Sequence, residues 1–146
     1  EAYKLKDYID IANSQIERFA FIYSFFGRKR RLLESRSTNR GVAGHAIRSG
    51  VNFLVQSVSS DINLLGLCDT IDWLETEKLN DVILPFTVVH DSVVSEVKNE
   101  YVEIYCNTLK KFLQRNRGVM IPNCPIGVDL EIGPSWGELE TWKPNV

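Results

Sequence analysis

The sequence lacks the features of a membrane, secreted or zinc-binding protein. Its most apolar stretch, residues 52–67, is interrupted by polar and acidic side chains and is too short to span a bilayer. The N-terminus, residues 1–4, is polar and has no signal-peptide pattern. The few cysteines have no CxxC spacing, which fits neither a disulfide framework nor a zinc site. They are Cys68, Cys106 and Cys124. We therefore expect reduced cysteines in a cytoplasmic protein that is not secreted and has no membrane partner.

Internal repeats, low-complexity segments and an initiating Met are also missing. Because the sequence does not begin with Met, we expect it to be a piece of a longer protein. The 146 residues are 44% hydrophobic and 25% charged, close to the average of globular proteins, which excludes a disordered chain. This length is enough for one core. We expect residues 1–146 to form a single, partial domain.

The net charge of −2 hides a strong asymmetry. The segment 28–48 contains seven basic residues and one acidic residue, a net charge of +6, which leaves −8 for the rest of the chain. A basic patch on an acidic body indicates contact with a polyanion. The alternative is a solvated, highly charged loop.

The pattern of apolar residues predicts an α+β fold, a small antiparallel sheet packed on helices. We expect helices over 3–19, 42–73 (with a possible break near Gly66) and 99–115, the last closed by a C-cap at 116–118. A short strand is expected over 20–26, a loop over 34–44 and a charged connection over 69–81. The sheet consists of a hairpin at 84–97 plus a strand at 127–133.

Two polar features stand out from this framework. His90 and Asp91 lie between two β-prone runs, so they form the tip of the hairpin, where a carboxylate can bind a metal ion. The alternative is an ordinary polar turn, because Asp is a common turn residue. Arg48, Asn52 and Gln56 recur every four residues, so they share one face of the long helix. The alternative is that Asn52 and Gln56, taken by themselves, are ordinary exposed residues of the helix surface.

Segments 26–30 and 48–61 each carry a motif. The first, Phe26-Gly27-Arg28-Lys29-Arg30, looks like a Phe-Gly-Arg-Arg-Arg turn. The second combines Arg48, Asn52 and Gln56 with Ser60-Asp61 and looks like an Arg-(three)-Asn-(three)-Gln helix that is followed by Ala-Asp.

Two further motifs follow in the same order. Val89-His90-Asp91 looks like a Val-His-Asp-Glu hairpin, and Gly133-Pro134-Ser135-Trp136 looks like a Gly-x-x-Trp closing segment. Together the four motifs resemble the C-terminal palm portion of a family A DNA polymerase, the bacterial polymerase I-like and phage-type group. The resemblance covers residues 20–137. Four ordered matches are more specific than any one alone.

The resemblance implies DNA-templated DNA synthesis, a nucleotidyl transfer with a two-ion Mg²⁺ site. Asp91 would bind a catalytic Mg²⁺, which prefers hard oxygen ligands. His90 would lie against the primer-end backbone as a hydrogen-bond donor and not as a base. The expected location is the cytoplasm of a bacterial or phage-infected cell.

The resemblance also implies contacts to primer-template DNA. Asn52 and Gln56 carry amides that can reach the minor-groove acceptors present on every base pair. Arg48 would contact the template or the primer. The basic turn would hold phosphates in a salt-sensitive, sequence-independent way. Its residues are Arg28, Lys29, Arg30 and Arg31.

The chain departs from the family in two ways. Ser92 stands where the group most often has Glu, which removes an acidic oxygen beside Asp91. The strand with the first catalytic carboxylate and the fingers helix that holds the incoming dNTP are missing. The segment Ser14-Gln15-Ile16-Glu17-Arg18 looks like part of the family's Asp-Tyr-Ser-Gln-Ile-Glu strand. However, Ala12 stands where that strand has its Asp, so we interpret the similarity as coincidence on a helix.

One Asp cannot hold two metal ions, so we expect activity only with an N-terminal polymerase chain or fragment. Without that partner, exposed apolar surface would favour self-association. Two alternatives stay open. The chain could be a catalytically inert DNA-binding module derived from a polymerase palm. It could also be an unrelated α+β interaction domain whose motif matches are accidental.

Overall fold

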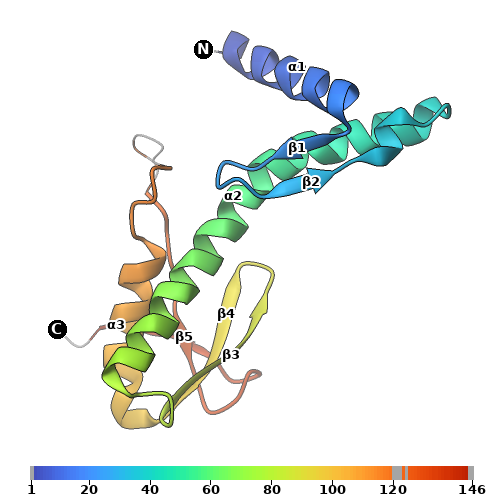
Figure 1. The fold of residues 1–146 in the computed structure, drawn as a ribbon. Helices are drawn as coiled ribbons and strands as arrows, with labels where there is room; N and C mark the ends of the chain where they lie inside the picture. The colour runs from blue at the N-terminus through green and yellow to red at the C-terminus, as the bar shows by residue number, and fades with distance from the viewer. Residues whose placement is uncertain (1, 120–122, 124, 145–146) are drawn as a thin grey trace. The chain divides into compact units, whose positions relative to one another are not determined.

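The chain forms two compact units, residues 1–61 and 62–146, in a computed structural model that describes residues 2–119, 123 and 125–144 (Figure 1). Helix α2, Arg40–Glu77, contributes to both units. Cys124 lies outside the described residues. Among the described helices, none has the length and hydropathy needed to cross a membrane.

Unit 1 begins with helix α1, Ala2–Phe19, which confirms the helix predicted over 3–19. A short antiparallel hairpin follows, with β1 at Phe21–Tyr23 and β2 at Lys29–Arg31. The predicted strand over 20–26 is therefore shorter than expected, because the chain turns after Tyr23 and Gly27 adopts a φ of +83°. The 3₁₀ helix η1, Leu33–Arg36, leads on to α2.

Helix α2 is longer at both ends than the predicted 42–73. The Oδ1 atom of Asn39 accepts hydrogen bonds from the amides of Gly41 (2.9 Å) and Val42 (3.3 Å), so Asn39 caps the helix. At the other end Lys78 has a φ of +57°, and the Leu79 amide donates to the Leu74 carbonyl. This left-handed ending uses no glycine, so the sequence carried little signal for it.

The core of unit 1 joins α1, the hairpin and α2. Ala12 and Ile16 of α1 pack with Ile22 of β1 and with Leu32, and all four are buried. Apolar residues of α2 complete the cluster: Ile47, Val51, Phe53 and Leu54. This packing presses one face of the hairpin against α2 and leaves the other face open.

Unit 2 contains the predicted hairpin, with β3 at Ile83–Val89 and β4 at Ser92–Val97. The 3₁₀ helix η2, Asn99–Tyr101, precedes helix α3, Val102–Leu113. The helix predicted over 99–115 is confirmed in its central part, but it ends at Leu113 with Gln114 as C-cap. The predicted C-cap at 116–118 is therefore wrong.

The predicted strand over 127–133 is only partly formed. Strand β5 covers Glu131–Ile132 and pairs with β6, Glu140–Thr141. In the described residues the strands form three separate two-stranded sheets, so this strand does not join the hairpin as expected. Val128 and Leu130 nevertheless pack on the core, whereas Ile132 is 40% exposed. The α+β class with small antiparallel sheets is confirmed.

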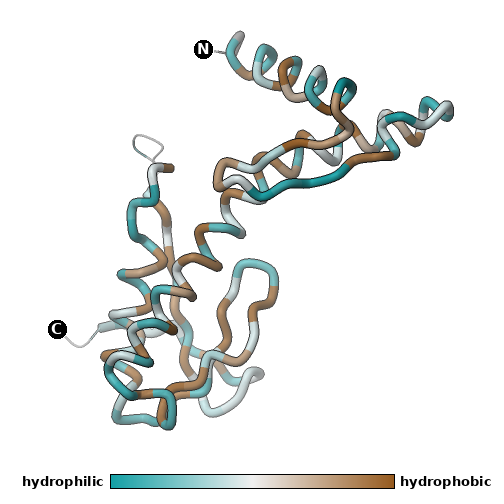
Figure 2. The backbone as a smooth tube through the Cα atoms, viewed as in Figure 1, coloured by the Kyte–Doolittle hydropathy of each residue, from teal (hydrophilic) through white to brown (hydrophobic). Residues whose placement is uncertain are grey.

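The core of unit 2 lies among α2, α3 and the hairpin. Its buried residues are Leu74, Ile83, Tyr105, Leu109 and Leu113. Helix α2 continues through Gly66, where a break was possible. Figure 2 shows the apolar residues of β3 and β4 as brown stretches next to a hydrophilic tip. The hairpin is thus held at its base and presents its polar tip to solvent.

Candidate nucleic-acid and metal site

The structure places His90 and Asp91 together in the two-residue loop between β3 and β4. Both residues are exposed. His90 has a φ of +56°, in the left-handed region that two-residue hairpin loops require. Asn63 of α2 donates from Nδ2 to the Asp91 backbone carbonyl at 2.9 Å. This bond anchors the tip through its main chain.

The Asp91 carboxylate is free to accept an external ligand. Among the described residues it has no hydrogen-bond or ion-pair partner. An exposed, unpartnered carboxylate is a suitable hard-oxygen ligand for Mg²⁺. In the described parts of the chain, however, no three His, Cys, Asp or Glu side chains gather as a metal site would require. Asp91 can therefore be one ligand of such a site.

The ladder Arg48, Asn52 and Gln56 lies on α2 within unit 1, and all three side chains are exposed. Because α2 is regular there, residues four apart point the same way. Arg48 and Asn52 line an open groove of about 510 Å³ beside α1. Asn13 and Glu17 of α1 line the same groove. The ladder thus presents two amides and a cation at one surface.

The basic turn divides into residues that face α2 and residues that face away. The Nη2 atom of Arg28 pairs with Asp61 Oδ1 at 2.9 Å, and the guanidinium lies 5.6 Å from the centre of the Phe53 ring. Arg30 donates from Nη2 to Ser49 Oγ at 2.8 Å, and its guanidinium lies 5.4 Å from the same ring. Lys29 and Arg31 occupy the alternate positions of β2.

Asp61 of α2 holds the basic turn in place through contacts with Arg28 and Ser24. Its residue is 8% exposed, and its Oδ2 accepts a hydrogen bond from Ser24 Oγ at 3.2 Å. Ser24 Oγ in turn accepts from the Arg28 amide at 3.0 Å. Asp61 therefore ties the turn to α2, 37 residues away from Ser24 in sequence. Burial of a paired carboxylate makes the turn rigid and places its cations.

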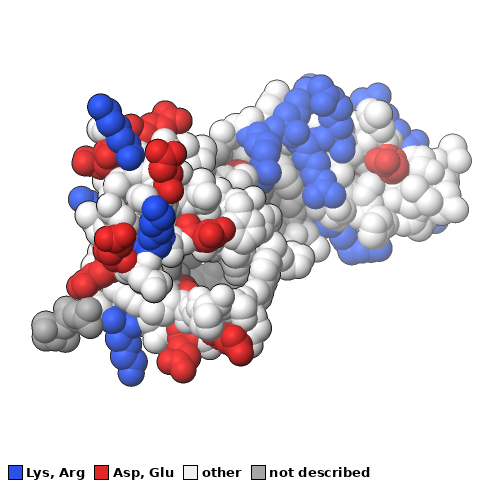
Figure 3. Space-filling model, turned by 90° about the horizontal axis from the view of Figure 1, so that it is seen from below, with Lys and Arg blue, Asp and Glu red and all other residues white. Residues whose placement is uncertain are grey.

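Positive charge gathers on unit 1 and negative charge on unit 2 (Figure 3). Unit 1 has ten basic and six acidic residues, a net charge of +4. Unit 2 has seven basic and thirteen acidic residues, a net charge of −6. The predicted charge asymmetry therefore coincides with the division into units.

Comparison with known proteins identifies the family. The family model "DNA polymerase family A" matches residues 1–138. The chain belongs to DNA polymerase family A. A DNA polymerase of Escherichia phage T5 is 44% identical over 126 residues, which are 86% of this chain and 15% of that protein. DNA polymerase I of Pseudomonas aeruginosa is 26% identical over 131 residues, 90% of this chain and 14% of that protein.

A solved family A structure has the same fold. The POL domain of Pol1 from M. smegmatis, in complex with DNA primer-template and dNTP, matches with a TM-score of 0.64 at 21% identity. The match covers 75% of this chain and 19% of that one. This chain therefore spans about 15% of the length of the curated family A relatives it matches.

Family A membership confirms the resemblance seen in the four motifs. It also excludes an unrelated interaction domain with accidental motif matches. The roles of the individual site residues stay predictions. They concern Asp91, His90, Arg28, Lys29, Arg30, Arg31, Arg48, Asn52 and Gln56.

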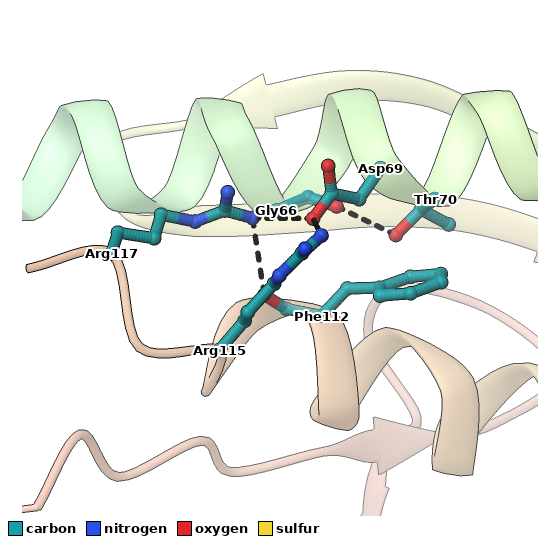
Figure 4. Close-up of polar contacts among 6 residues, drawn as sticks. All are labelled: Gly66, Asp69, Thr70, Phe112, Arg115 and Arg117. Carbon is teal, nitrogen blue, oxygen red and sulfur yellow. Dashed lines mark hydrogen bonds and ion pairs between the residues drawn. The ribbon is translucent and has the colours of Figure 1, made fainter.

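A further polar cluster of this family A chain was missed from the sequence (Figure 4). Asp69 Oδ2 of α2 pairs with Arg115 Nη1 at 3.1 Å and with Arg117 Nη2 at 2.8 Å. Arg117 Nη2 also donates to the Phe112 carbonyl at 3.3 Å. Burial alone would raise the pKa of Asp69, but the two arginines outweigh it and lower that pKa. The cluster joins α2 to the segment after α3.

Two features of the site have no signal in the sequence. Nothing in the spacing connects the amide of Asn63 to a carbonyl 28 residues later. The division of the four adjacent basic residues 28–31 between two faces also has no local signal. Assigning faces requires the register of the hairpin, in which Ile22 faces Arg30.

Proposed function

We propose that this chain is the part of a family A DNA polymerase that supplies one metal-binding Asp and the primer-template contacts. The reaction is DNA-templated DNA synthesis, and the enzyme is a DNA-directed DNA polymerase only in combination with an N-terminal polymerase chain or fragment. The observation that carries the proposal is the unpartnered Asp91 carboxylate at an anchored hairpin tip. Relatives from a phage and from bacteria support a bacterial or phage-infected cytoplasm as the location.

Asp91 fits Mg²⁺ as a single ligand. Its carboxylate is exposed, and the Asn63 bond to its carbonyl holds the main chain while the side chain stays available. Two bound Mg²⁺ ions would stabilise the attacking and leaving oxygens. The remaining carboxylate must come from outside this chain. His90, beside it, would donate to a phosphate or sugar oxygen at the primer end.

The DNA contacts are divided between the ladder and the basic hairpin. Asn52 and Gln56 present amides that can reach minor-groove acceptors without reading sequence. Arg48 would contact the template or primer backbone. Lys29 and Arg31, which are not tied to α2, are the stronger candidates for direct phosphate contacts. Arg28 and Arg30 add positive charge while they hold the hairpin in place.

Unit 1 has the apolar surface that an N-terminal partner would cover. Several of its large hydrophobic side chains are more than half exposed. They include Leu5, Ile11, Phe25 and Val55. Exposed apolar side chains on this scale are typical of an interaction surface. The partner would also hold the incoming dNTP, and self-association is expected in its absence.

The decisive test is primer extension by the chain mixed with a candidate N-terminal half, primer-template, dNTPs and Mg²⁺. Asp91→Asn should lower the rate by roughly 10³-fold or more, because it removes about 4 kcal/mol of metal-dependent stabilisation. Duplex affinity, measured by fluorescence anisotropy, should stay nearly unchanged. Glu96→Gln removes a carboxylate from the same hairpin and should retain activity. Full activity of Asp91→Asn would refute the metal assignment.

The alternative is a catalytically inert DNA-binding module. It is favoured by the single candidate ligand among the described residues and by Ser92 at the usual Glu position. This alternative predicts salt-sensitive duplex binding without extension by any N-terminal half. It also predicts no effect of Mg²⁺ on duplex affinity.

A further inference from the structure

The β1–β2 hairpin of unit 1 has two chemically different faces. In its antiparallel register Phe21 lies opposite Arg31, Ile22 opposite Arg30 and Tyr23 opposite Lys29. Successive residues of a strand point to opposite faces, and directly paired residues share a face. Ile22 and Arg30 therefore lie on one face, and the other two pairs lie on the opposite face.

The inner face is committed to α2. Ile22 is buried in the unit 1 core, and Arg30 bonds to Ser49 of α2. Phe53 of α2 lies under the guanidinium groups of both Arg28 and Arg30. These contacts engage Ile22 and Arg30 in packing on α2, so the side chains of the outer face are the ones available for further binding.

The outer face combines a row of aromatic rings with cations. The ring centres of Phe19 and Phe21 are 5.8 Å apart, and those of Phe21 and Tyr23 are 5.5 Å apart. Phe19 is 46% exposed and Tyr23 is 52% exposed. Lys29 Nζ lies 3.7 Å from the centre of the Phe21 ring and 5.7 Å from that of Tyr23. Arg31 completes this face and has no ion pair among the described residues.

We propose that this outer face is a stacking platform for unpaired bases of a single-stranded nucleic acid. The aromatic rings supply flat surfaces for bases, and the cations on the same face supply charge for the phosphates between those bases. The rings that take the bases are Tyr23 and Phe19, while Lys29 leaves Phe21 to contact a phosphate. Exposed cation–π contacts are weak enough for this exchange.

Charge complementarity favours a nucleic acid over a protein as the occupant. The cations of this face, Lys29 and Arg31, lie within the segment 28–48, which has a net charge of +6. Protein interfaces are depleted of Lys at their centres, whereas Lys29 lies in the middle of this aromatic row. A single-stranded nucleic acid, with one negative charge and one base per nucleotide, matches this combination of cations and aromatic rings. The proposal deepens the proposed function, on which it rests, by assigning the unpaired part of the template strand to this face.

The test compares two fluorescently labelled 12-mers of equal charge, oligo-dT and an oligomer of abasic sites, by anisotropy with the whole chain. The wild-type chain should bind oligo-dT about tenfold more tightly, because only oligo-dT can stack. Tyr23→Leu keeps an apolar side chain but removes the ring, and it should lose most of this preference. Its affinity for the abasic oligomer should stay the same.

Trp136→Leu is the matched control, because Trp136 is also an exposed aromatic, 61% exposed, but lies in unit 2. It should leave both affinities unchanged. Equal wild-type binding of the two oligomers would overturn the proposal. So would a Tyr23→Leu variant with unchanged DNA binding but weakened self-association, which would identify a protein interface. A circular dichroism melt confirms that each variant is folded.

The result is independent of catalysis. If primer extension fails with every N-terminal half but oligo-dT preference is present and depends on Tyr23, the proposed function fails and the stacking platform stands. If extension succeeds but the preference for oligo-dT is absent, the proposed function stands and the stacking platform fails.

Discussion

At the residue scale, Asp69 shows how one carboxylate can stabilise the end of an element. Arg117 is nearly buried, with 12% of its side chain exposed, while Arg115 is 62% exposed. The Arg117 pair should therefore contribute more, since solvent weakens exposed ion pairs. Arg117 Nη2 also donates a hydrogen bond to the Phe112 carbonyl, which holds the segment after α3 against the end of that helix.

This cluster predicts a specific pH dependence. A carboxylate whose pKa is lower in the folded protein adds stability above its unfolded pKa, and this stability is lost as the pH falls through the folded value. Asp69→Asn should lower the free energy of unfolding by about 1–2 kcal/mol at pH 7. The difference between wild type and variant should shrink below about pH 4. Urea unfolding at several pH values measures it.

Asp72→Asn provides the control for Asp69. Asp72 lies on the same helix, is exposed and has no ion pair in the described residues. Its substitution should change the unfolding free energy by less than about 0.5 kcal/mol at any pH. A loss for Asp69→Asn that stays constant down to pH 2 would contradict the assignment of the stability to the ionised pair.

At the scale of elements, the packing of α3 on α2 depends on Gly66. A Cβ atom at this position would lie 2.6 Å from Leu113 Cδ2 and 3.1 Å from Leu113 Cα. The second of these atoms belongs to the backbone, so the helices themselves would have to move apart. A glycine in a helix costs stability relative to Ala, and here the close approach of α3 is the reason for it.

Gly66→Ala should therefore lower the free energy of unfolding by about 1–3 kcal/mol, despite the better helix propensity of Ala. Gly44→Ala is the matched control in α2, because a Cβ there meets only the flexible end of Arg48 at 3.3 Å. It should raise stability by about 0.5–1 kcal/mol. Chemical denaturation of both variants measures the difference. Stabilisation by both substitutions would show that α3 does not pack this closely.

At the scale of the whole molecule, the separation of charge predicts where DNA binds. Lys29→Gln combined with Arg31→Gln removes two cations that no helix contact engages. Duplex affinity should fall, and the slope of log affinity against log salt should become shallower by about 2. Anisotropy titrations between about 50 and 200 mM salt measure the slope.

The control is a double variant that combines Lys110→Gln with Lys111→Gln. It changes the net charge of the chain by the same amount as the Lys29/Arg31 double variant, but its two sites are in α3 of unit 2, the acidic unit. This pair should leave the salt slope unchanged. Equal losses for both double variants would mean that total charge alone governs binding, and would contradict a binding surface on unit 1.

The sequence by itself determined the elements with strong local signals. The apolar period predicted α1 and most of α2, and the two β-prone runs predicted a hairpin with His90 and Asp91 at its tip. The four ordered motifs also led to the family, since they depend on residue identity and order. The helix ends were less predictable, because Asn39 and Lys78 act through hydrogen bonds and a left-handed φ with weak sequence signals.

Only the tertiary structure decided which of the charged residues are committed and which are free. Arg28 meets Asp61, and Arg117 meets Asp69, across 33 and 48 residues of sequence. Such pairs form only after helices and hairpins pack, so no local pattern reveals them. The same packing buries Ile22 and turns Tyr23 and Lys29 outward. The packing thereby divides the basic residues 28–31 into two groups. One group is engaged in contacts with α2, and the other is available for binding.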